Sequence, residues 1–522
     1  MTTSSLPLSA LLSGVEDAVV GSGARAEEIM VTDVRDDSRQ VQAGDLFVAV
    51  PGTAADGRSF VAAAVARGAR VIVSAGETPA DTGGAITVTV ADARQALSMI
   101  AANRFGAAAA LSLMAVTGTN GKTTTTYLVE AMLAATGLVP GVIGTVSYRS
   151  AAPGWQGGAR AASLTTPGSL ALHALLADMR AAGTTDVVLE ASSHALDQRR
   201  LDGCRFRVAA LTNVTQDHLD YHVSMDRYFE AKTILFERLL DPARGVAVFL
   251  IDDDAGRKMR RRVSGVPTLG VTLKPSAPGG DIAIVERQLS VDGMRLRLAT
   301  PVGEIAVEST LVGEFNLANI ALAVGMGVAR GLPPKAIADG LRALPGVPGR
   351  LEPVANKRGV LCVVDYAHTP DALERAIAAL RPLTGKRLIV VFGCGGDRDR
   401  GKRPLMGEVA ARDGDIAIVT SDNPRTEVPE TIVDMVVDGA RRALAPELSP
   451  DELPGAERGY LREVDRRAAI RIAAAAAQPG DVLLIAGKGH EDYQIVGTTK
   501  FPFDDRLEAA AALAASDGQA AR

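Results

Sequence analysis

The part of the chain best suited to chemistry is one glycine-containing turn, Val116-Thr117-Gly118-Thr119-Asn120-Gly121-Lys122-Thr123-Thr124. The apolar run before it, Leu111–Val116, predicts a buried strand, and the stretch Thr123–Leu133 predicts a helix after it. Glycines in such a turn let backbone N–H groups approach phosphate oxygens, and the start of the helix adds a partial positive charge. Lys122 would reach the outer phosphates and the Thr123 hydroxyl would hold Mg²⁺. The turn therefore predicts a site for a nucleoside triphosphate.

This motif departs from the strict phosphate-binding pattern, which has glycine where this chain has Val116. The alternative is a glycine turn that merely starts a helix, and the strand and helix on either side argue against it. A second stretch, Gly396–Arg403, matches the bare spacing better, but it lacks the hydroxyl and has two aspartates inside the loop. Because aspartates repel phosphate, we interpret it as a different kind of site.

Two further polar side chains follow predicted strands of the same region. Glu190 ends the strand pattern Asp186–Glu190, and His218 lies in the loop after Val208–Leu211. Since ligands of α/β sheets bind beyond the carboxyl ends of the strands, both residues are candidate metal ligands near the triphosphate. Each also has an ordinary alternative, an acidic residue at a helix start and a solvated loop histidine.

Two predicted helices of this region carry further expectations. Thr166 is a suitable N-cap with Pro167 at the first helical position, so a helix is expected to begin there. The amphipathic stretch Met225–Leu240 predicts a helix that carries Lys232, which on residue type alone is a solvated lysine. Farther along, alternating apolar and polar residues over Asp281–Val312 predict a meander of short strands.

In the last third of the chain, polar residues again follow buried strands. Strands are expected at Val360–Val364, Arg387–Phe392, Asp415–Thr420 and Asp481–Ala486, and the helices between them predict a doubly wound sheet. Asp, Arg and His side chains come after these strands, and unpaired arginines there suit bidentate recognition of a carboxylate. The alternative is a surface network of ion pairs that satisfy one another.

The same patterns divide the chain into three α/β units, residues 1–110, 111–348 and 349–522. In the first unit, short strands are expected at Asp45–Val50 and Arg70–Val73, and helices at Ser59–Arg67 and Asp92–Phe105. Its polar loops, residues 36–39 and 51–57, have the composition of ordinary turns.

Composition argues against several classes of protein. The net charge of −5 over 522 residues does not favour nucleic acid as a partner. Three cysteines without paired spacing, Cys204, Cys362 and Cys394, argue against a disulfide framework or a zinc site. The first basic residue is Arg25, so a signal-peptide pattern is absent, and no apolar run approaches the ~18 residues of a membrane span. We therefore expect a cytoplasmic protein without a membrane span.

With these residues described, the chain resembles the Mur ligases of peptidoglycan synthesis over essentially its whole length. The resemblance rests on six motifs: residues 118–124, Glu190-Ala191-Ser192-Ser193-His194, Asn213–His222, Asn316 in its Phe-Asn-x-x-Asn setting, Asp365-Tyr366-Ala367-His368-Thr369-Pro370 and Asp422-Asn423-Pro424-Arg425. It implies a small N-terminal domain for the uridine nucleotide substrate, a central ATP-binding domain of the P-loop type, and a C-terminal Rossmann-like domain for an amino acid.

The resemblance also implies which residues form these sites. ATP would contact Gly118, Thr119, Asn120, Gly121, Lys122, Thr123, Thr124, Asn316, Arg350, Asp365 and His368. The nucleotide-sugar substrate would contact Ser38, Thr53, Ala54, Ala55, Thr165, Thr166, Ser192, Gln198 and Arg200. The amino acid would contact Arg398, Asp422, Asn423, Pro424, Arg425, Gly487 and Glu491.

The resemblance changes the interpretation of Lys232, which matches the family's carbamylated lysine. Addition of CO₂ converts an ammonium that would repel Mg²⁺ into an anion that can bind it. The expected catalytic residues are then Lys122, Glu190, His218 and carbamylated Lys232. The expected metal ligands are Thr123, Glu190, His218 and carbamylated Lys232.

The implied reaction is the ATP-dependent addition of meso-2,6-diaminopimelate to UDP-N-acetylmuramoyl-L-alanyl-D-glutamate through an acyl phosphate, in cytoplasmic peptidoglycan precursor synthesis. The Asp-Asn-Pro-Arg motif marks diaminopimelate in this family, and Arg425 could pair with the carboxylate that L-lysine lacks. The alternatives are the same reaction with L-lysine, another Mur-type or folylpolyglutamate-type amide ligase, and an ATP-binding switch or scaffold. A monomer is expected.

Overall fold

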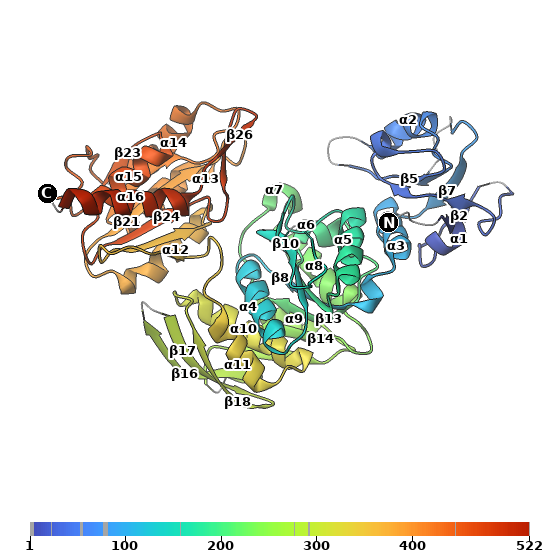
Figure 1. Cartoon of the computed structure of the whole chain (residues 1–522), viewed down its shortest axis with the longest axis horizontal. Helices are drawn as coiled ribbons and strands as arrows, with labels where there is room; N and C mark the ends of the chain where they lie inside the picture. The colour runs from blue at the N-terminus through green and yellow to red at the C-terminus, as the bar shows by residue number, and fades with distance from the viewer. Residues whose placement is uncertain are drawn as a thin grey trace. The chain divides into compact units, whose positions relative to one another are not determined.

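The computed structural model describes residues 5–21, 23–52, 56–76, 82–156, 158–275, 277–290, 293–443 and 445–520. The chain folds into two compact units, which are described separately. Unit 1 comprises Met1–Glu286, Arg297–Ala306 and Ala318–Leu341, and unit 2 comprises Arg287–Leu296, Val307–Leu317 and Arg342–Arg522. Sheets flanked by helices occur in both (Figure 1), which confirms the predicted α/β class. The domain boundaries near residues 110 and 348 stay predictions.

The N-terminal part of unit 1 is a small mixed sheet. Its strands run in the order β2 (Val19–Val20), β7 (Ile86–Val90), β6 (Val71–Ala75), β5 (Leu46–Ala49) and β4 (Val34–Arg35). β2 is antiparallel to β7 and the other neighbours are parallel. Helices α1 (Leu8–Leu11) and α3 (Ala93–Phe105) pack on one face and α2 (Val61–Ala66) on the other. A short antiparallel pair, β1 (Leu6–Pro7) with β3 (Met30–Val31), precedes the sheet.

The larger sheet of unit 1 positions the predicted phosphate-binding turn. Its parallel strands run in the order β9 (Pro140–Ile143), β12 (Asp186–Glu190), β8 (Ser112–Thr117), β13 (Phe206–Leu211), β14 (Val246–Leu250), β15 (Thr268–Thr272) and β16 (Ile282–Ser290). β10 (Ser147–Ser150) and β11 (Arg160–Ala161) continue one edge, and β17 (Gly293–Thr300) and β18 (Gly303–Ser309) continue the other. Because β8, β12 and β13 are parallel neighbours, the residues after their carboxyl ends meet.

Helices cover both faces of this sheet. The core on one face includes residues of α5 (Ser169–Ala182), α6 (Ser193–Asp197), α8 (Met225–Ile234) and α9 (Asp254–Arg262). The remaining helices are α4 (Lys122–Ala135), α7 (Leu219–His222), α10 (Phe315–Arg330) and α11 (Pro334–Ala343). Close packing ties α4 to α11, since a Cβ at Gly340 would lie 2.5 Å from Met132 Cα.

Unit 2 contains a doubly wound sheet, as its strand patterns predicted. The order is β19 (Glu352–Val354), β20 (Leu361–Asp365), β24 (Val482–Ala486), β21 (Leu388–Cys394), β22 (Ile416–Ser421) and β23 (Gly459–Arg462), with β19 alone antiparallel. One face packs against α12 (Pro370–Leu380), α13 (Lys402–Asp413) and α14 (Pro429–Arg442), and the other against α15 (Arg466–Ala476) and α16 (Asp505–Ala520). A hairpin of β25 (Tyr493–Val496) and β26 (Thr499–Pro502) follows β24.

One predicted helix start is wrong. Helix α5 begins at Ser169, and its N-cap is Gly168 rather than Thr166. The Thr166 hydroxyl donates to the Glu190 carbonyl oxygen at 2.7 Å, so it is committed to the end of β12 and is not available as a cap. The expected Met225–Leu240 helix is α8 followed by a π-helical turn, Leu235–Leu239.

The three cysteines are free and buried, in agreement with the absence of a disulfide framework in the sequence. Within the described residues, no helix is both long enough and apolar enough to cross a membrane.

Candidate active site

The phosphate-binding turn lies between β8 and α4, where the sequence predicted it. Gly118 has φ +144°, and a Cβ there would lie 1.9 Å from the Thr212 hydroxyl oxygen, so only glycine fits. The turn is fixed to the loop after β13, because Thr119 N donates to the Asn213 carbonyl at 2.9 Å. Asn120 N also donates to the Asn213 side chain at 3.1 Å. The turn is therefore shaped before any phosphate arrives.

Lys122 lies at the start of α4 and folds back over the turn. Its Nζ donates to the carbonyl oxygens of Gly118 at 3.0 Å and Thr119 at 2.9 Å. Those bonds hold the ammonium above the backbone that would cradle phosphate, which is the position expected for a lysine that binds the outer phosphates.

Glu190, at the end of β12, is a buried carboxylate that gathers hydroxyl groups. Thr123 Oγ1 donates to Glu190 Oε2 at 3.1 Å, and Thr145 donates to both carboxylate oxygens through its N and Oγ1, at 2.9 and 3.0 Å. Glu190 is 1 % exposed. A hydroxyl and a carboxylate side by side are hard oxygen donors of the type that Mg²⁺ prefers, so this pair fits the predicted metal site.

Lys232 is buried directly beneath the turn, which contradicts the solvated lysine expected from its residue type. It is 1 % exposed, its Nζ donates to the Gly118 carbonyl at 3.2 Å, and it lies 4.0 Å from the centre of the Tyr228 ring. Burial, followed by repulsion from Lys122, lowers the Lys232 pKa well below its usual value. A lysine with a lowered pKa is a better nucleophile for CO₂, because more of it is neutral.

His218 lies beside other aromatic side chains in the segment around α7. Its ring lies 4.8 Å from His194 and 6.1 Å from Tyr228, centre to centre. His218 has φ +53°, a left-handed conformation uncommon for a residue with a side chain. Desolvation lowers the pKa of His218 to about 4, so its ring is neutral near pH 7. A neutral imidazole is the form that binds a metal ion.

The residues predicted to hold the nucleotide-sugar substrate fall into two groups. Thr165, Thr166, Ser192, Gln198 and Arg200 come together near Glu190: Thr145 bonds to Thr165 at 3.1 Å, Thr166 to Ser192 at 3.2 Å, and Arg200 to the Thr166 carbonyl at 2.9 Å. Arg200 also donates to the Gln198 carboxamide oxygen. Ser38 lies apart from them in the N-terminal sheet region, buried in a short 3₁₀ turn. Thr53, Ala54 and Ala55 lie outside the described residues.

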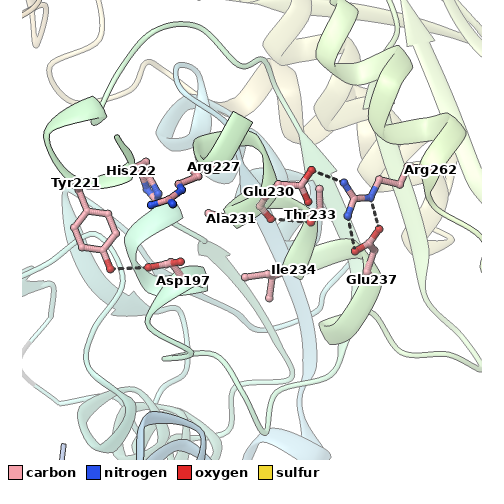
Figure 2. Close-up of a pocket in the computed structure, with 10 residues that line it drawn as sticks. All are labelled: Asp197, Tyr221, His222, Arg227, Glu230, Ala231, Thr233, Ile234, Glu237 and Arg262. Atoms are coloured by element: carbon pink, nitrogen blue, oxygen red, sulfur yellow. Dashed lines mark hydrogen bonds and ion pairs between the residues drawn. The ribbon is translucent and has the colours of Figure 1, made fainter. Parts of the chain in front are cut away.

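A pocket of about 680 Å³ lies on another side of α8 (Figure 2). None of the predicted site residues lines it. Its arginine Arg262 is paired with Glu230 at 2.5 Å and with Glu237 at 2.6 Å, and Tyr221 donates to Asp197 at 2.7 Å. Because none of the predicted phosphate-binding residues lines it, we do not assign this pocket to ATP.

Unit 2 contains the remaining residues predicted for ATP. Asp365 ends β20 and accepts from Leu351 N and Ala367 N, each at 2.8 Å, while burial raises its pKa. Arg350 lies 5.0 Å from the Tyr366 ring centre, and His368 bonds through Nδ1 to the Tyr366 carbonyl at 2.8 Å. Asn316 is buried and donates to the Val312 carbonyl at 2.7 Å.

The residues predicted to bind the amino acid meet beyond β22 and β24. Asn423 Nδ2 donates to Glu491 at 2.9 Å, and Gly487 follows the end of β24 with φ +116°. The sequence analysis missed the residue at their centre, Lys488, which is fully buried and lies 3.2 Å from Glu491 and 3.6 Å from Asp422. Its setting between two glycines after a parallel strand was the available signal.

Two arginines belong to the same predicted amino-acid site. Arg425 Nη1 donates to the Gly396 carbonyl at 2.8 Å, and Arg398 Nη1 donates to the Asp397 carbonyl at 3.0 Å. A Cβ at Gly395 would lie 2.9 Å from Arg425 and 3.8 Å from Arg398, so both side chains approach that glycine. In the part of the chain that the structure describes, neither arginine forms an ion pair with an acidic side chain. Both can therefore bind a ligand carboxylate.

Thr145 is the other residue that the sequence analysis missed. It follows β9 and links Glu190 to Thr165. Its position just after a parallel strand could have suggested it. Among the described residues, no three His, Cys, Asp or Glu side chains cluster as a metal site. The predicted ligands instead combine one carboxylate and one histidine with a hydroxyl and a carbamylated lysine.

Three family models match successive parts of the chain. Residues 31–105 match the family model "Mur ligase family, catalytic domain", residues 116–327 match "Mur ligase middle domain", and residues 349–489 match "Mur ligase, glutamate ligase domain". A curated relative from Geobacter metallireducens is 47 % identical over 91 % of this chain and 93 % of its own length. It is named UDP-N-acetylmuramoyl-L-alanyl-D-glutamate–2,6-diaminopimelate ligase.

Solved structures agree with the curated relative. A structure of a UDP-N-acetylmuramoyl-L-alanyl-D-glutamate–2,6-diaminopimelate ligase is 33 % identical, covers 98 % of this chain and 99 % of its own, and has a TM-score of 0.69. The MurF ligase of Thermotoga maritima in complex with ADP, at 21 % identity, shares the fold with a TM-score of 0.58 over 93 % of this chain and 97 % of its own.

Proposed function

The chain belongs to the Mur ligase family, and from that premise we propose that it adds meso-2,6-diaminopimelate to UDP-N-acetylmuramoyl-L-alanyl-D-glutamate with conversion of ATP to ADP and phosphate. The observation that carries the choice of amino acid is the group of charged residues beyond β22 and β24 of unit 2, which we call the amino-acid pocket. Here Arg425 and Arg398, which lack acidic partners in the described chain, accompany Asp422 and Glu491, two carboxylates that share the buried Lys488. This is the charge pattern of an amino acid that carries a second carboxylate.

The first step joins two anions, the γ-carboxylate of the D-glutamyl residue and the γ-phosphate of ATP, so charge neutralisation dominates it. Lys122 and the backbone N–H groups of the turn would bind the phosphates. Arg200, beside Thr166, is suited to hold the peptide carboxylate in place. The product is an acyl phosphate and ADP.

Thr123 and Glu190 would hold one Mg²⁺, and His218 and carbamylated Lys232 would hold a second. Together the two ions would supply charge stabilisation at the transferred phosphoryl group. Support for this part comes from the adjacent hydroxyl and carboxylate of Thr123 and Glu190, and from the buried Lys232 with its lowered pKa. Carbamylation would remove a buried positive charge next to Lys122, because a carbamate is anionic.

In the second step an amine of diaminopimelate attacks the acyl phosphate, the amide bond forms and inorganic phosphate leaves. Asp422, Asn423 and Glu491 would orient the amino acid, while Arg425 and Arg398 would bind its distal carboxylate. Ser38 and the loop of Thr53, Ala54 and Ala55 are proposed to contact the uridine end of the other substrate. We place this reaction in the cytoplasm and expect a monomer.

The test is phosphate release from ATP with Mg²⁺ and the UDP-linked dipeptide, comparing meso-diaminopimelate with L-lysine. Phosphate release that needs both the UDP-linked substrate and diaminopimelate is the expected result. Turnover with lysine at equal kcat/KM would overturn the proposed amino acid and keep the ligase reaction. Phosphate release without any amino acid would favour an ATP-dependent switch instead.

A further inference from the structure

An arginine next to the amino-acid pocket is completely buried and paired with a single carboxylate. Arg403, in the first turn of α13, is 0 % exposed, and its Nη1 and Nη2 donate to Glu427 Oε2 at 3.0 Å and Oε1 at 2.7 Å. Such a two-point bond fixes both side chains in one plane. Glu427 keeps 13 % of its side chain exposed and also pairs with the exposed Arg400 at 3.1 Å. An ion pair at a largely buried position contributes little net stability compared with apolar residues, which suggests that this pair has another role.

The pair holds both neighbours of Gly396. Arg403 Nη2 also donates to the Gly395 carbonyl at 3.2 Å, and Glu427 Oε1 accepts from Asp397 N at 2.7 Å. Between these two points lies the Gly396 carbonyl, which accepts from Arg425 Nη1 at 2.8 Å. The orientation of that carbonyl, and hence of the Arg425 guanidinium, is therefore set from both sides.

The same loop is packed against the segment that carries Arg425. A Cβ at Gly396 would lie 1.9 Å from the Pro424 carbonyl oxygen, and Gly396 N donates to the Asn423 carbonyl at 2.9 Å. The Arg425 backbone is held independently, since its N donates to Ile495 O at 3.1 Å and its carbonyl accepts from Gly497 N at 2.7 Å. What the ion pair adds is thus control of the side chain.

We infer that Arg403 and Glu427 form a clamp that, through Gly396, aims Arg425 at the distal carboxylate of the incoming amino acid. The inference rests on the proposed function and extends it by two positioning residues that do not touch the substrate. Loss of the clamp leaves the Arg425 charge in place but frees its direction, so binding of the dicarboxylic amino acid weakens while ATP binding does not.

The test variant is R403M/E427Q, which removes the ion pair without leaving a buried charge unpaired. Its KM for diaminopimelate should rise by ~10- to 100-fold, with KM for ATP within about twofold of the wild type. If that variant does not fold, R403K replaces it, because an ammonium cannot reproduce the planar contacts to Glu427 and Gly395. An unchanged KM for diaminopimelate in the folded variant would overturn the inference.

The matched control is D481N, which breaks another buried ion pair of unit 2. Asp481 is bound by Arg387 at 2.7 Å and precedes β24, so it lies at the opposite end of the strand from Gly487. D481N should lower thermal stability and leave KM for diaminopimelate unchanged. A similar rise of KM in D481N would mean that the effect of the clamp variant is general destabilisation, and would also overturn the inference.

A mutant cycle with R425A tests the route of the effect. If the clamp acts through Arg425, adding R403M/E427Q to R425A should raise KM for diaminopimelate by less than about twofold more. If R403M/E427Q raised KM for diaminopimelate as much in the R425A background as in the wild type, the inference would be overturned. Wild-type turnover is measured first: its absence would contradict the proposed function, whereas normal wild-type turnover with an insensitive clamp variant contradicts only the clamp.

Discussion

The phosphate turn of unit 1 and the amino-acid pocket of unit 2 hold their cations in different ways. In the turn, Lys122 and Lys232 both donate to the Gly118 carbonyl, so two lysine side chains share a backbone oxygen. In the pocket, Arg425 also bonds to a backbone carbonyl, but that carbonyl is fixed by the ion pair of Arg403 with Glu427. Backbone carbonyls alone hold the lysines of the turn, whereas an ion pair of side chains fixes the carbonyl that holds Arg425.

The difference indicates how each site should respond to its ligand. The two carbonyl oxygens only partly balance the charge of Lys122. Anionic phosphate oxygens would bind it more strongly, so we expect the side chain to move toward bound ATP. The Arg425 guanidinium has five N–H donors and is already aimed, so it can add a carboxylate without giving up its existing bond. We therefore expect phosphate binding in unit 1 to depend mainly on the charge of Lys122. Amino-acid binding in unit 2 should depend mainly on the orientation of the Arg425 guanidinium.

The largest effect is expected from Lys122→Met, which removes the charge and keeps the length of the side chain. We expect kcat to fall by at least about 10³-fold, because the lysine stabilises charge on the transferred phosphoryl group. Phosphate release under saturating substrates measures this. Lys335→Met is the control, since Lys335 is an exposed lysine paired within α11 with Asp339. If the Lys122 variant kept the wild-type kcat, the proposed role of this turn in phosphoryl transfer would be wrong.

A smaller effect is expected from Arg425→Lys, which keeps the charge and removes the planar fork. If geometry governs unit 2, KM for diaminopimelate should rise ~10- to 100-fold while kcat at saturation changes little. Steady-state kinetics with each substrate varied separately provide the measurement. Arg462→Lys, at an exposed ion pair with Asp434, should be silent. If Arg425→Lys kept the wild-type KM for diaminopimelate, a positive charge alone would be enough to bind the distal carboxylate. The proposed difference between the two units would then be wrong.

The parts of these sites that the sequence predicted are the local ones. The strand and helix around the turn were expected at residues 111–116 and 123–133 and are found at Ser112–Thr117 and Lys122–Ala135. Periodicity and a glycine turn act over a few residues, so they can be read directly.

What the sequence alone could not provide depends on contacts between distant segments. Residue type favoured a solvated Lys232, yet the fold buries it against Gly118, 114 residues away. Arg403 was noted only for lacking the hydroxyl of a phosphate-binding motif, whereas its role depends on Glu427 from another loop. The predicted N-cap at Thr166 was wrong for the same reason, because the Thr166 hydroxyl donates to the Glu190 carbonyl instead.

A buried histidine of unit 1 and the Arg403–Glu427 clamp of unit 2 should differ in their response to acid. Burial lowers the pKa of His173, in α5 of unit 1, from 6.5 to about 4. Between those values the unfolded chain binds a proton that the folded chain does not, so stability falls as pH falls from 6.5 toward 4. We expect unit 1 to lose about 2 kcal/mol between pH 7 and pH 5 from this group.

Urea unfolding followed by Trp155 fluorescence measures this, since the single tryptophan lies in unit 1. His173→Phe should reduce the difference between the two pH values. In unit 2, the bonds from Arg403 and Asp397 lower the Glu427 pKa from 4.5 to about 2. Its contribution is present above pH 4.5 and is lost only as pH falls toward 2, so the clamp should not titrate in this range. Equal acid sensitivity in His173→Phe would contradict the assignment to this histidine.

The smallest effect concerns backbone strain near the phosphate site. Val223, at the end of α7, has φ +67° and ψ −37°, and Ser224 N donates to the His222 carbonyl at 2.7 Å across it. This is a γ-turn that a β-branched residue adopts at a cost of ~1–3 kcal/mol. Arg425 has a positive φ as well, but two backbone bonds to the hairpin strand and its turn hold it there.

Val223→Gly should therefore stabilise unit 1 by about 1 kcal/mol, after the entropy that glycine loses on folding is subtracted. Its side chain is 71 % exposed, so little packing is lost. Trp155 fluorescence in urea measures the change, and Val302→Gly is the matched control. Val302 is an exposed turn valine without a positive φ, so glycine there should destabilise. If Val223→Gly destabilised unit 1 as much as Val302→Gly, the backbone at Val223 would carry no strain.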